Sequence, residues 1–244
     1  MNFIGKKILV TGGGAGIGRG IVKTLASRGA DVYVISRSQS NLDTLQTECS
    51  NSVVTKCLDI TQYDSLKQFI SSLPPLDGLV NNAGTLVARK FLEVSTSDFD
   101  KQMDINVKGN YFVAQAVAQN MVKHKKSGSI VHVSSQSSQA AYADRALCGM
   151  SKAALDNLAK NMALELGPYG IRVNCVNPTV VITALTRQVG WADPVKADSL
   201  MSKIPLGRFA EVDEVVGPVL FLLSDDSAMV SGTTLPIDGG YLAT

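Results

Sequence analysis

The chain has little of several residue types on which common functions depend. Its 244 residues include two histidines and four cysteines, and no two cysteines form a Cys-x-x-Cys pair. This pattern does not indicate a disulfide framework or a zinc site, and we expect no bound metal. The N-terminus lacks the apolar segment of a signal peptide, and no apolar run reaches membrane-spanning length. These features predict a cytoplasmic protein without a transmembrane segment.

The chain also has little net charge. The 23 basic and 21 acidic residues leave a net charge of +2, and the one basic cluster, Lys123–Lys126, suits a solvated helix end. Nucleic acid is therefore not expected as a partner. The second histidine, His132, lies in an apolar strand, where we expect it to be packed and hydrogen-bonded. With no Gly-x-Ser-x-Gly motif either, a Ser-His-Asp hydrolase is not supported.

What the chain does contain is a glycine-rich turn near its start. An apolar run, Ile8–Val10, stops at a glycine cluster that passes into Arg19–Ala26, whose apolar residues recur at helical spacing. At such a strand-turn-helix junction Gly12 permits a reversal, Gly16 allows close approach to a phosphate, and Gly18 allows the helix to lie against the strand. The unpaired N–H groups of the first helical turn favour a pyrophosphate.

Context favours a dinucleotide site over an ordinary glycine turn, because a second strand-like run, Asp31–Ile35, returns at the distance of one βαβ unit. Strand-like runs then alternate with amphipathic segments almost to the end of the chain. They are Ile8–Val10, Val32–Ile35, Val53–Leu58, Gly78–Val80, Ser129–Val133, Arg172–Val176 and Thr233–Pro236. Strands that are apolar along their whole length are covered on both faces.

The predicted fold is therefore α/β: a doubly wound, Rossmann-type, mostly parallel seven-stranded sheet with helices on both faces. The length suits one domain over residues 1–244, and no repeat or linker divides it. Residues 184–203, which contain Trp191 and two helix breakers, are expected to cover the site. Trp191 either contacts substrate or serves as packing.

The residues after the second strand decide which dinucleotide fits. An acidic residue there would accept a hydrogen bond from the ribose 2′-hydroxyl and repel a 2′-phosphate. The chain has Ser36 and Arg37 instead, which predicts NADP(H) over NAD(H), unless Arg37 simply faces water. Asp59, after the third strand, is placed to accept a hydrogen bond from the adenine amino group, although an exposed loop carboxylate would look the same.

Polar turns follow two later strands at the carboxyl edge of the predicted sheet, where doubly wound folds bind ligands. These turns are Asn81–Gly84 and Asn177–Thr183. Between them, Ser95–Asp98 offers N-cap chemistry for a long helix that contains Asn106. Asn106 either binds water or backbone in a kink or is exposed.

Together these motifs resemble the short-chain dehydrogenase/reductase family over essentially the whole length. The matching pieces are Thr11–Gly18, Asn81–Gly84, Asn106, Ser135, Lys152 and Pro178–Thr183. Further pieces look like the animal dicarbonyl/L-xylulose reductases: Ser134–Gln139, Asn177–Val181, Ile204–Glu211 and Leu235–Gly240. That resemblance implies NADPH as cofactor, an α-dicarbonyl or ketose substrate such as L-xylulose, and a homotetramer.

The resemblance also implies residue roles. Ser135 would hold the carbonyl oxygen, Lys152 would bind the nicotinamide ribose, and the backbone carbonyl of Asn106 would anchor a water that leads to Lys152. The implied cofactor contacts are Gly12, Gly16, Ile17, Gly18, Ser36, Arg37, Asp59, Asn82, Ala83, Gly84, Lys152, Val181 and Thr183. The implied substrate contacts are Ser135, Gln136, Tyr142 and Trp191.

One position departs from the family pattern Tyr-x-x-x-Lys, because four residues before Lys152 stands Cys148. A tyrosine there would donate a proton to the carbonyl oxygen, and a thiol is shorter than a phenol by roughly the length of the ring. Three outcomes remain open: strongly reduced activity, a proton from water or another side chain, or chemistry of the thiol itself. Tyr142, the nearest tyrosine, is more suited to lining the substrate cavity than to replacing the missing donor.

A milder departure is Ala15, where the subgroup often has a lysine. The sequence therefore predicts an NADPH-dependent reductase of small carbonyl compounds, impaired at its proton donor. The alternative is a catalytically silent NADP(H)-binding relative that acts as a sensor or partner subunit. A purely structural role as an oligomer surface is a third possibility.

Overall fold

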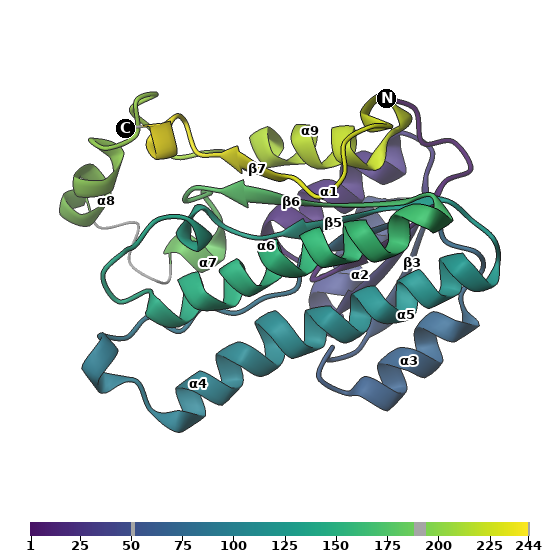
Figure 1. The fold of residues 1–244 in the computed structure, drawn as a ribbon, viewed down its shortest axis with the longest axis horizontal. Helices are drawn as coiled ribbons and strands as arrows, with labels where there is room; N and C mark the ends of the chain where they lie inside the picture. The colour runs from purple at the N-terminus through teal and green to yellow at the C-terminus, as the bar shows by residue number, and fades with distance from the viewer. Residues whose placement is uncertain (50–51, 188–193, 244) are drawn as a thin grey trace.

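The computed structural model describes residues 1–49, 52–187 and 194–243 (Figure 1). Seven strands form one sheet in the order β3-β2-β1-β4-β5-β6-β7, and every neighbouring pair is parallel. The strands are β1 (Lys7–Thr11), β2 (Asp31–Ser36), β3 (Val53–Cys57), β4 (Gly78–Asn81), β5 (Gly128–Val133), β6 (Ile171–Pro178) and β7 (Thr234–Ile237). The predicted doubly wound fold is confirmed, and the sheet is wholly parallel.

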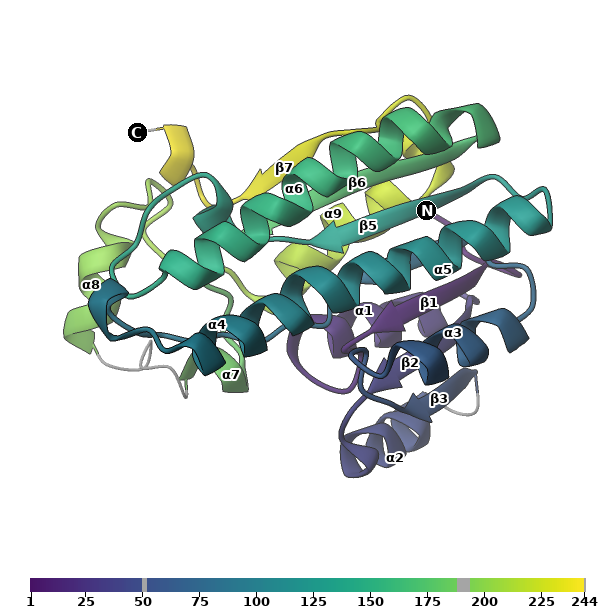
Figure 2. The same ribbon diagram turned by 60° about the horizontal axis from the view of Figure 1, so that its bottom comes forward.

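Helices cover both faces of this sheet (Figures 1 and 2). They are α1 (Gly16–Ser27), α2 (Gln39–Glu48), α3 (Tyr63–Ser72), α4 (Thr96–Met103), α5 (Asn110–Lys123), α6 (Ala146–Leu166), α7 (Ala184–Thr186), α8 (Pro194–Met201) and α9 (Val212–Leu223). Buried side chains of α1, α2 and α9 pack on one face, and those of α3, α5 and α6 on the other.

The strand β1 shows how the sequence specifies two apolar faces. Ile8 and Val10 pack toward α1 and α9, whereas Leu9, between them, packs in the opposite core with α3 and α5. Side chains alternate along a strand, so an uninterrupted apolar run feeds both cores. The expectation fails at the edge strand β3, where Val53 packs into the core with α2 but Val54, on the opposite face, is 52% exposed, because the core on that face includes no residue of β3.

The long helix expected around Asn106 is instead two α-helices joined by a π-helical segment, Asp104–Gly109. Its start is as predicted: Ser95 caps α4, and its side chain forms a reciprocal capping box with Asp98. A π-turn widens the helix and redirects side chains, and such turns are frequent at functional sites. Here the turn buries Asn106 completely.

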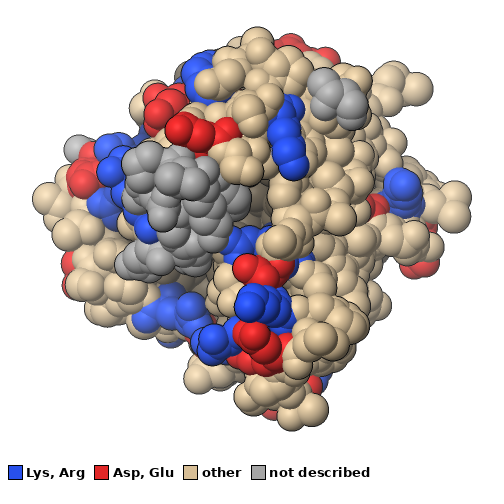
Figure 3. Space-filling view, turned by 90° about the vertical axis from the view of Figure 1, so that its left-hand side faces the viewer, with Lys and Arg blue, Asp and Glu red and all other residues tan. Residues whose placement is uncertain are grey.

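The carboxyl ends of all seven strands point to the end of the molecule that Figure 3 shows face-on. The strand order reverses between β1 and β4, and the crevice outside this switch point is where doubly wound folds bind ligands. Acidic and basic side chains are interspersed over this face (Figure 3). Among the described helices, none combines the length and apolar character that a membrane crossing needs.

Candidate active site

The glycine turn between β1 and α1 has the backbone geometry that the sequence predicts. Gly12 has φ of +65° and Gly16 has φ of +53°, in a backbone region that residues with a side chain rarely adopt. A Cβ atom on Gly18 would collide with the Gly12 carbonyl, so the start of α1 lies directly against the end of β1. The turn therefore leaves the first N–H groups of a twelve-residue helix facing the switch point.

Two strands hold this turn in place. The side-chain amide of Asn82 donates to the carbonyl oxygens of Thr11, at 3.0 Å, and Gly12, at 3.2 Å. In return, the Thr11 hydroxyl accepts hydrogen bonds from the backbone N–H groups of Asn82 and Ala83, both at 3.0 Å. The turn after β4 is thus bonded directly to the turn after β1.

The end of β2 carries hydroxyl and guanidinium groups and no acid. The Ser36 hydroxyl lies beside the glycine turn, since a Cβ on Gly14 would lie 2.7 Å from Ser36 Oγ. The Arg37 side chain is 61% exposed, and one of its nitrogens lies 3.8 Å from Asp59 Oδ2. The other Asp59 oxygen accepts hydrogen bonds from the backbone N–H and hydroxyl of Thr61. Arg37 therefore extends into solvent with its position set by Asp59.

Three of the predicted residues converge between β4 and α6. The Lys152 ammonium donates to the Val133 carbonyl at 2.8 Å. A Cβ placed on Gly84 would lie 3.4 Å from Asn106 Oδ1 and 3.8 Å from Lys152 Nζ. Burial lowers the pKa of Lys152, and the nearby Cys148 acts in the opposite direction. The site thus holds a partly buried ammonium group at the carboxyl edge of the sheet.

The open question about Asn106 has a clear answer. Its side-chain oxygen accepts from the backbone N–H of Thr85 at 2.8 Å. Its amide nitrogen donates to the Thr85 carbonyl at 3.0 Å and to Ser151 Oγ at 3.2 Å. Asn106 therefore binds backbone in a widened helical turn and connects the loop after β4 to α6.

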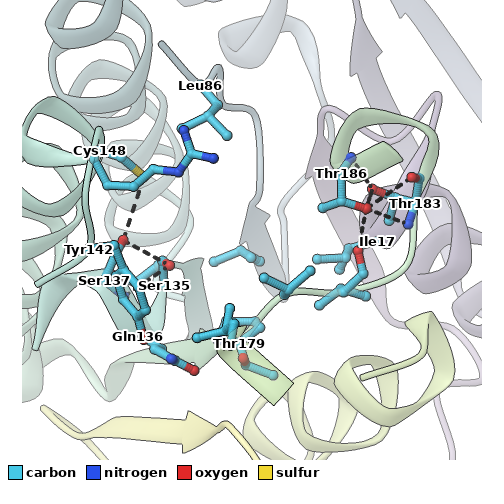
Figure 4. A pocket seen from close by; sticks show the side chains of 17 residues that line it. Ile17, Leu86, Ser135, Gln136, Ser137, Tyr142, Cys148, Thr179, Thr183 and Thr186 are labelled. Atoms are coloured by element: carbon cyan, nitrogen blue, oxygen red, sulfur yellow. Dashed lines mark hydrogen bonds between the residues drawn. The ribbon is translucent and has the colours of Figure 1, made fainter. Parts of the chain in front are cut away.

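Ser135 and Cys148 are linked through a residue that the sequence reasoning did not single out. Ser135 Oγ accepts from the Ser137 backbone N–H at 3.1 Å and from the Ser137 hydroxyl at 3.0 Å. Ser137 Oγ also lies 3.5 Å from Cys148 Sγ. Figure 4 shows this row of side chains along one wall of a cavity. The sequence run Ser134–Gln139 contained the signal, as a second hydroxyl two residues after Ser135.

The cavity, of about 210 Å³, joins predicted cofactor residues to predicted substrate residues. Its lining is Ile17, Leu86, Val133, Ser134, Ser135, Gln136, Ser137, Tyr142, Arg145, Cys148, Pro178, Thr179, Val180, Val181, Thr183, Thr186 and Leu200. Ile17, Thr183 and Thr186 lie across from the wall that carries Ser135 and Cys148 (Figure 4). The other predicted cofactor residues, from Gly12 to Lys152, lie outside this lining.

Tyr142 lines the cavity from the loop before α6 and packs against Tyr241, with ring centroids 5.6 Å apart. Burial raises the pKa of Tyr142 well above its ordinary value, and the neighbouring Tyr241 and Asp238 raise it further. A phenol with a raised pKa is a weaker acid, which argues against Tyr142 as the replacement proton donor.

Arg145 was not identified from the sequence, although it lies three residues before Cys148. It is 8% exposed and lines the cavity just before α6 begins. Residues three apart at the start of a helix lie on one face, so the spacing between Arg145 and Cys148 could have indicated that both side chains line the same site. The cavity therefore contains a buried cation in addition to the hydroxyl and thiol groups.

The predicted covering segment contributes α7 and α8. Thr183 caps α7 through a reciprocal pair of bonds with Thr186. Leu200 of α8 belongs to a small apolar cluster that packs against Tyr142 and Tyr241, and it also lines the cavity. The predicted contact Trp191 lies outside the described residues.

His132 is packed and hydrogen-bonded, as predicted. It is fully buried, and its Nδ1 lies 3.3 Å from the amide nitrogen of Asn81. Burial, with a smaller effect of Lys152, lowers the pKa of His132 to about 4, so the ring is neutral near pH 7.

Comparison with known proteins agrees with this geometry. A family model described as Enoyl-(Acyl carrier protein) reductase matches residues 12–242. An L-xylulose reductase of Mesocricetus auratus is 48% identical over 244 residues, covering 100% of this chain and 99% of the relative. A carbonyl reductase (NADPH) 2 of Sus scrofa is 42% identical and covers 100% and 99%.

Among solved structures, a gluconate 5-dehydrogenase from Burkholderia cenocepacia in complex with NADP and tartrate has a TM-score of 0.93 to this chain. It is 30% identical and covers 100% of this chain and 97% of that one. The sheet, the glycine turn and these relatives define an oxidoreductase with a dinucleotide-binding fold. The chain belongs to the short-chain dehydrogenase/reductase family.

Proposed function

We propose that the protein reduces a small carbonyl compound, an α-dicarbonyl or a ketose such as L-xylulose, with NADPH as the reductant. The observation that carries this proposal is the cavity, because it runs from Ile17 beside the glycine turn to the Ser135 hydroxyl. A carbonyl group placed against Ser135 would lie next to the space that a nicotinamide ring needs. The names of the L-xylulose and carbonyl reductase relatives support the same substrate class.

The glycine turn fits a dinucleotide, since the positive φ of Gly12 and Gly16 leaves the first N–H groups of α1 facing the switch point, where they can bind a pyrophosphate. The pyrophosphate would lie at the start of α1, with Ser36 and Arg37 toward the 2′-phosphate and Asp59 toward the adenine. Asn82, Ala83, Gly84, Val181 and Thr183 would complete the binding surface. When bound, NADPH supplies the hydride.

Ser135 has the bonding pattern of a donor to the carbonyl oxygen. A hydroxyl has two acceptor positions and one proton, and Ser137 already occupies both acceptor positions of Ser135. The Ser135 proton is therefore left to point into the cavity. Lys152, held on the Val133 carbonyl, adds a positive charge near the reacting centre, which stabilises the oxyanion that forms on hydride transfer.

Cys148 stands where the family pattern has tyrosine, and no phenol reaches the carbonyl oxygen from that position. We therefore propose that turnover is slower than in a relative with the tyrosine. The covering segment, residues 184–203, and Trp191 would close over the substrate, with Gln136 and Tyr142 on the cavity wall.

The test is NADPH oxidation, followed by absorbance at 340 nm, with diacetyl and L-xylulose. We expect steady turnover that depends on both reactants and that is lower with NADH. Absence of turnover with the wild-type protein and also with Cys148→Tyr would contradict the proposal.

A silent NADP(H)-binding relative is the second candidate. It is favoured by the combination of an intact glycine turn with the absence of the tyrosine proton donor. It predicts that NADPH raises the melting temperature while no carbonyl compound is reduced. Quenching of Trp191 fluorescence by NADPH would report the same binding. If NADPH changed neither property, this candidate would be excluded.

We also propose a homotetramer in the cytoplasm. The outer surfaces of α5 and α6 form a groove of about 920 Å³ that includes Tyr111, Val122, Leu158 and Met162. Apolar and aromatic side chains on two neighbouring helices suit an interface between identical subunits. The mass in solution, measured by light scattering, tests the assembly.

A further inference from the structure

The missing tyrosine raises the question of where the product's proton comes from. Cys148 itself is too short to reach the carbonyl oxygen as a phenol would, but Ser137, beside it on the cavity wall, connects it to Ser135, against which the carbonyl oxygen is proposed to lie. We propose that Ser137 carries a proton from Cys148 to Ser135, which then donates to the carbonyl oxygen. This inference rests on the proposed reductase activity and explains how the activity survives the departure from Tyr-x-x-x-Lys.

The direction of each hydrogen bond follows from counting protons. The Ser137 hydroxyl donates to Ser135 Oγ at 3.0 Å, so its single proton is committed to that bond. In its contact with Cys148, at 3.5 Å, Ser137 Oγ must therefore be the acceptor, and the thiol S–H is the donor. The three groups form one continuous row whose last proton, on Ser135, points to the substrate.

The row is also ordered by acidity. Unperturbed thiols ionise near pH 8.5 and phenols near pH 10, whereas aliphatic hydroxyls are far weaker acids. The alkoxide of a newly formed alcohol is a strong base, so net transfer of a proton to it from a thiol is favourable. A thiol is therefore a suitable net source of this proton, and the two serines supply the missing reach.

Each proton has a defined origin and destination. As hydride adds to the carbonyl carbon, the oxygen takes the Ser135 proton, Ser135 takes the Ser137 proton, and Ser137 takes the Cys148 proton. The alcohol leaves, and Cys148 remains as a thiolate until water returns its proton. Lys152 lies one helical turn after Cys148, and the Cys148 side chain acts to raise the pKa of Lys152.

Ser137 offers the sharpest test, because a relay through Ser137 and direct donation by a tyrosine at position 148 predict different effects of removing its hydroxyl. In the wild-type background we expect Ser137→Ala to lower kcat for diacetyl by about tenfold or more, since general acid catalysis is interrupted. In the Cys148→Tyr background a phenol donates directly, so the same substitution should change kcat by less than about threefold. Cys148→Ala should cost about as much as Ser137→Ala, and the double variant no more than either.

Ser138→Ala is the matched control. The Ser138 hydroxyl donates to the Ser135 carbonyl at 2.8 Å and accepts from the Asn177 amide at 2.8 Å, and within the described residues it has no hydrogen bond to Cys148, so it supports the loop without joining the row. We expect its effect to be the same in both backgrounds. Melting temperatures of all variants separate loss of folding from loss of proton transfer.

A second measurement responds to proton movement alone. In mixtures of H₂O and D₂O, several protons moving in one step give a curved dependence of kcat on the deuterium fraction. We expect curvature for the wild type and a line for Cys148→Tyr/Ser137→Ala.

If Ser137→Ala lowered kcat equally in the wild-type and Cys148→Tyr backgrounds, Ser137 would only position Ser135, and the relay would be overturned. An inactive wild type with an active Cys148→Tyr variant would also overturn it, and would favour the silent NADP(H)-binding relative over the proposed reductase. Inactivity of both proteins would instead remove the proposed function, and the relay with it.

Discussion

The two ends of the cavity are built differently. At the glycine turn, Asn82 and Thr11 exchange hydrogen bonds and Gly18 lies against a carbonyl, so sequence and packing define one conformation. At the opposite end, Cys148 is half-buried at the start of α6, and its contact within the cavity wall is a 3.5 Å approach to Ser137. The fold depends on the first set of residues, whereas the side chain at position 148 lines a cavity, so we expect its exchange to cost the helix little. A departure from the family pattern is therefore tolerated structurally at the substrate end.

The largest expected effect follows from restoring the phenol at this tolerant position. Cys148→Tyr should raise kcat for diacetyl by about 10- to 10³-fold, because a positioned general acid contributes about 10²- to 10⁴-fold and the relay through Ser137 already supplies about tenfold of it. The melting temperature should change little, because residue 148 lines a cavity and does not fill a core. Steady-state kinetics with diacetyl checks this.

Tyr142→Phe in both backgrounds is the control for rescue by the nearest tyrosine. Because the pKa of Tyr142 is raised by burial, we expect no loss of proton donation from this substitution. A large loss confined to the protein with Cys148 would make Tyr142 the donor.

Much of the cofactor end could be predicted from the sequence, because glycines report backbone conformation directly. The strand-turn-helix at Gly12–Gly18 and the cap at Ser95 depend on neighbours in the chain, and both occur as predicted. The π-turn around Asn106 could not be predicted, since it depends on bonds to Thr85 and Ser151, which are remote in sequence.

The substrate end was harder to predict for the same reason. The link from Ser135 to Cys148 depends on how the loop before α6 folds back, and no spacing rule gives that. Arg145 was accessible from its helical spacing to Cys148, but sequence alone does not distinguish a buried arginine from a solvated one.

The next largest effect is on the pH dependence of stability and comes from His132, which lies on the strand that leads into the substrate end. Its folded pKa is about 4, below the unfolded value of 6.5, so the unfolded state binds a proton first as pH falls. Stability is therefore full above pH 6.5 and is lost as pH falls toward 4, by about 3 kcal/mol in total. Urea unfolding at pH 7.5 and pH 5 should show about 2 kcal/mol of this loss.

His132→Gln removes the titrating group and should flatten this part of the pH dependence. His124→Gln, at the exposed end of α5, should leave it unchanged. If the wild type and His132→Gln lost stability in parallel between pH 7.5 and 5, the buried ring would not be the cause.

At the glycine turn, packing predicts a smaller but specific loss. Gly18→Ala places a methyl group against the Gly12 carbonyl, which should lower the free energy of unfolding by about 2 kcal/mol and weaken NADPH binding. Gly217→Ala, in α9, is the matched control, because a Cβ there has open space around it. That substitution should stabilise the protein by about 0.5 to 1 kcal/mol and leave NADPH binding unchanged.

The smallest expected effect is on NADPH affinity and concerns the exposed edge of the cofactor end. There the side chain is solvated, unlike the tightly packed glycine turn. Arg37 is 61% exposed and is positioned by Asp59 at 3.8 Å, so its contribution to phosphate binding is reduced by solvent. Arg37→Gln should weaken NADPH binding by about tenfold while NADH binding stays the same, since only NADPH carries the 2′-phosphate. Titration calorimetry with both dinucleotides measures this, and Arg28→Gln, at the far end of α1, is the control for loss of one positive charge. Equal weakening for NADPH and NADH would assign Arg37 to the shape of the loop and leave recognition of the 2′-phosphate to Ser36 and the backbone.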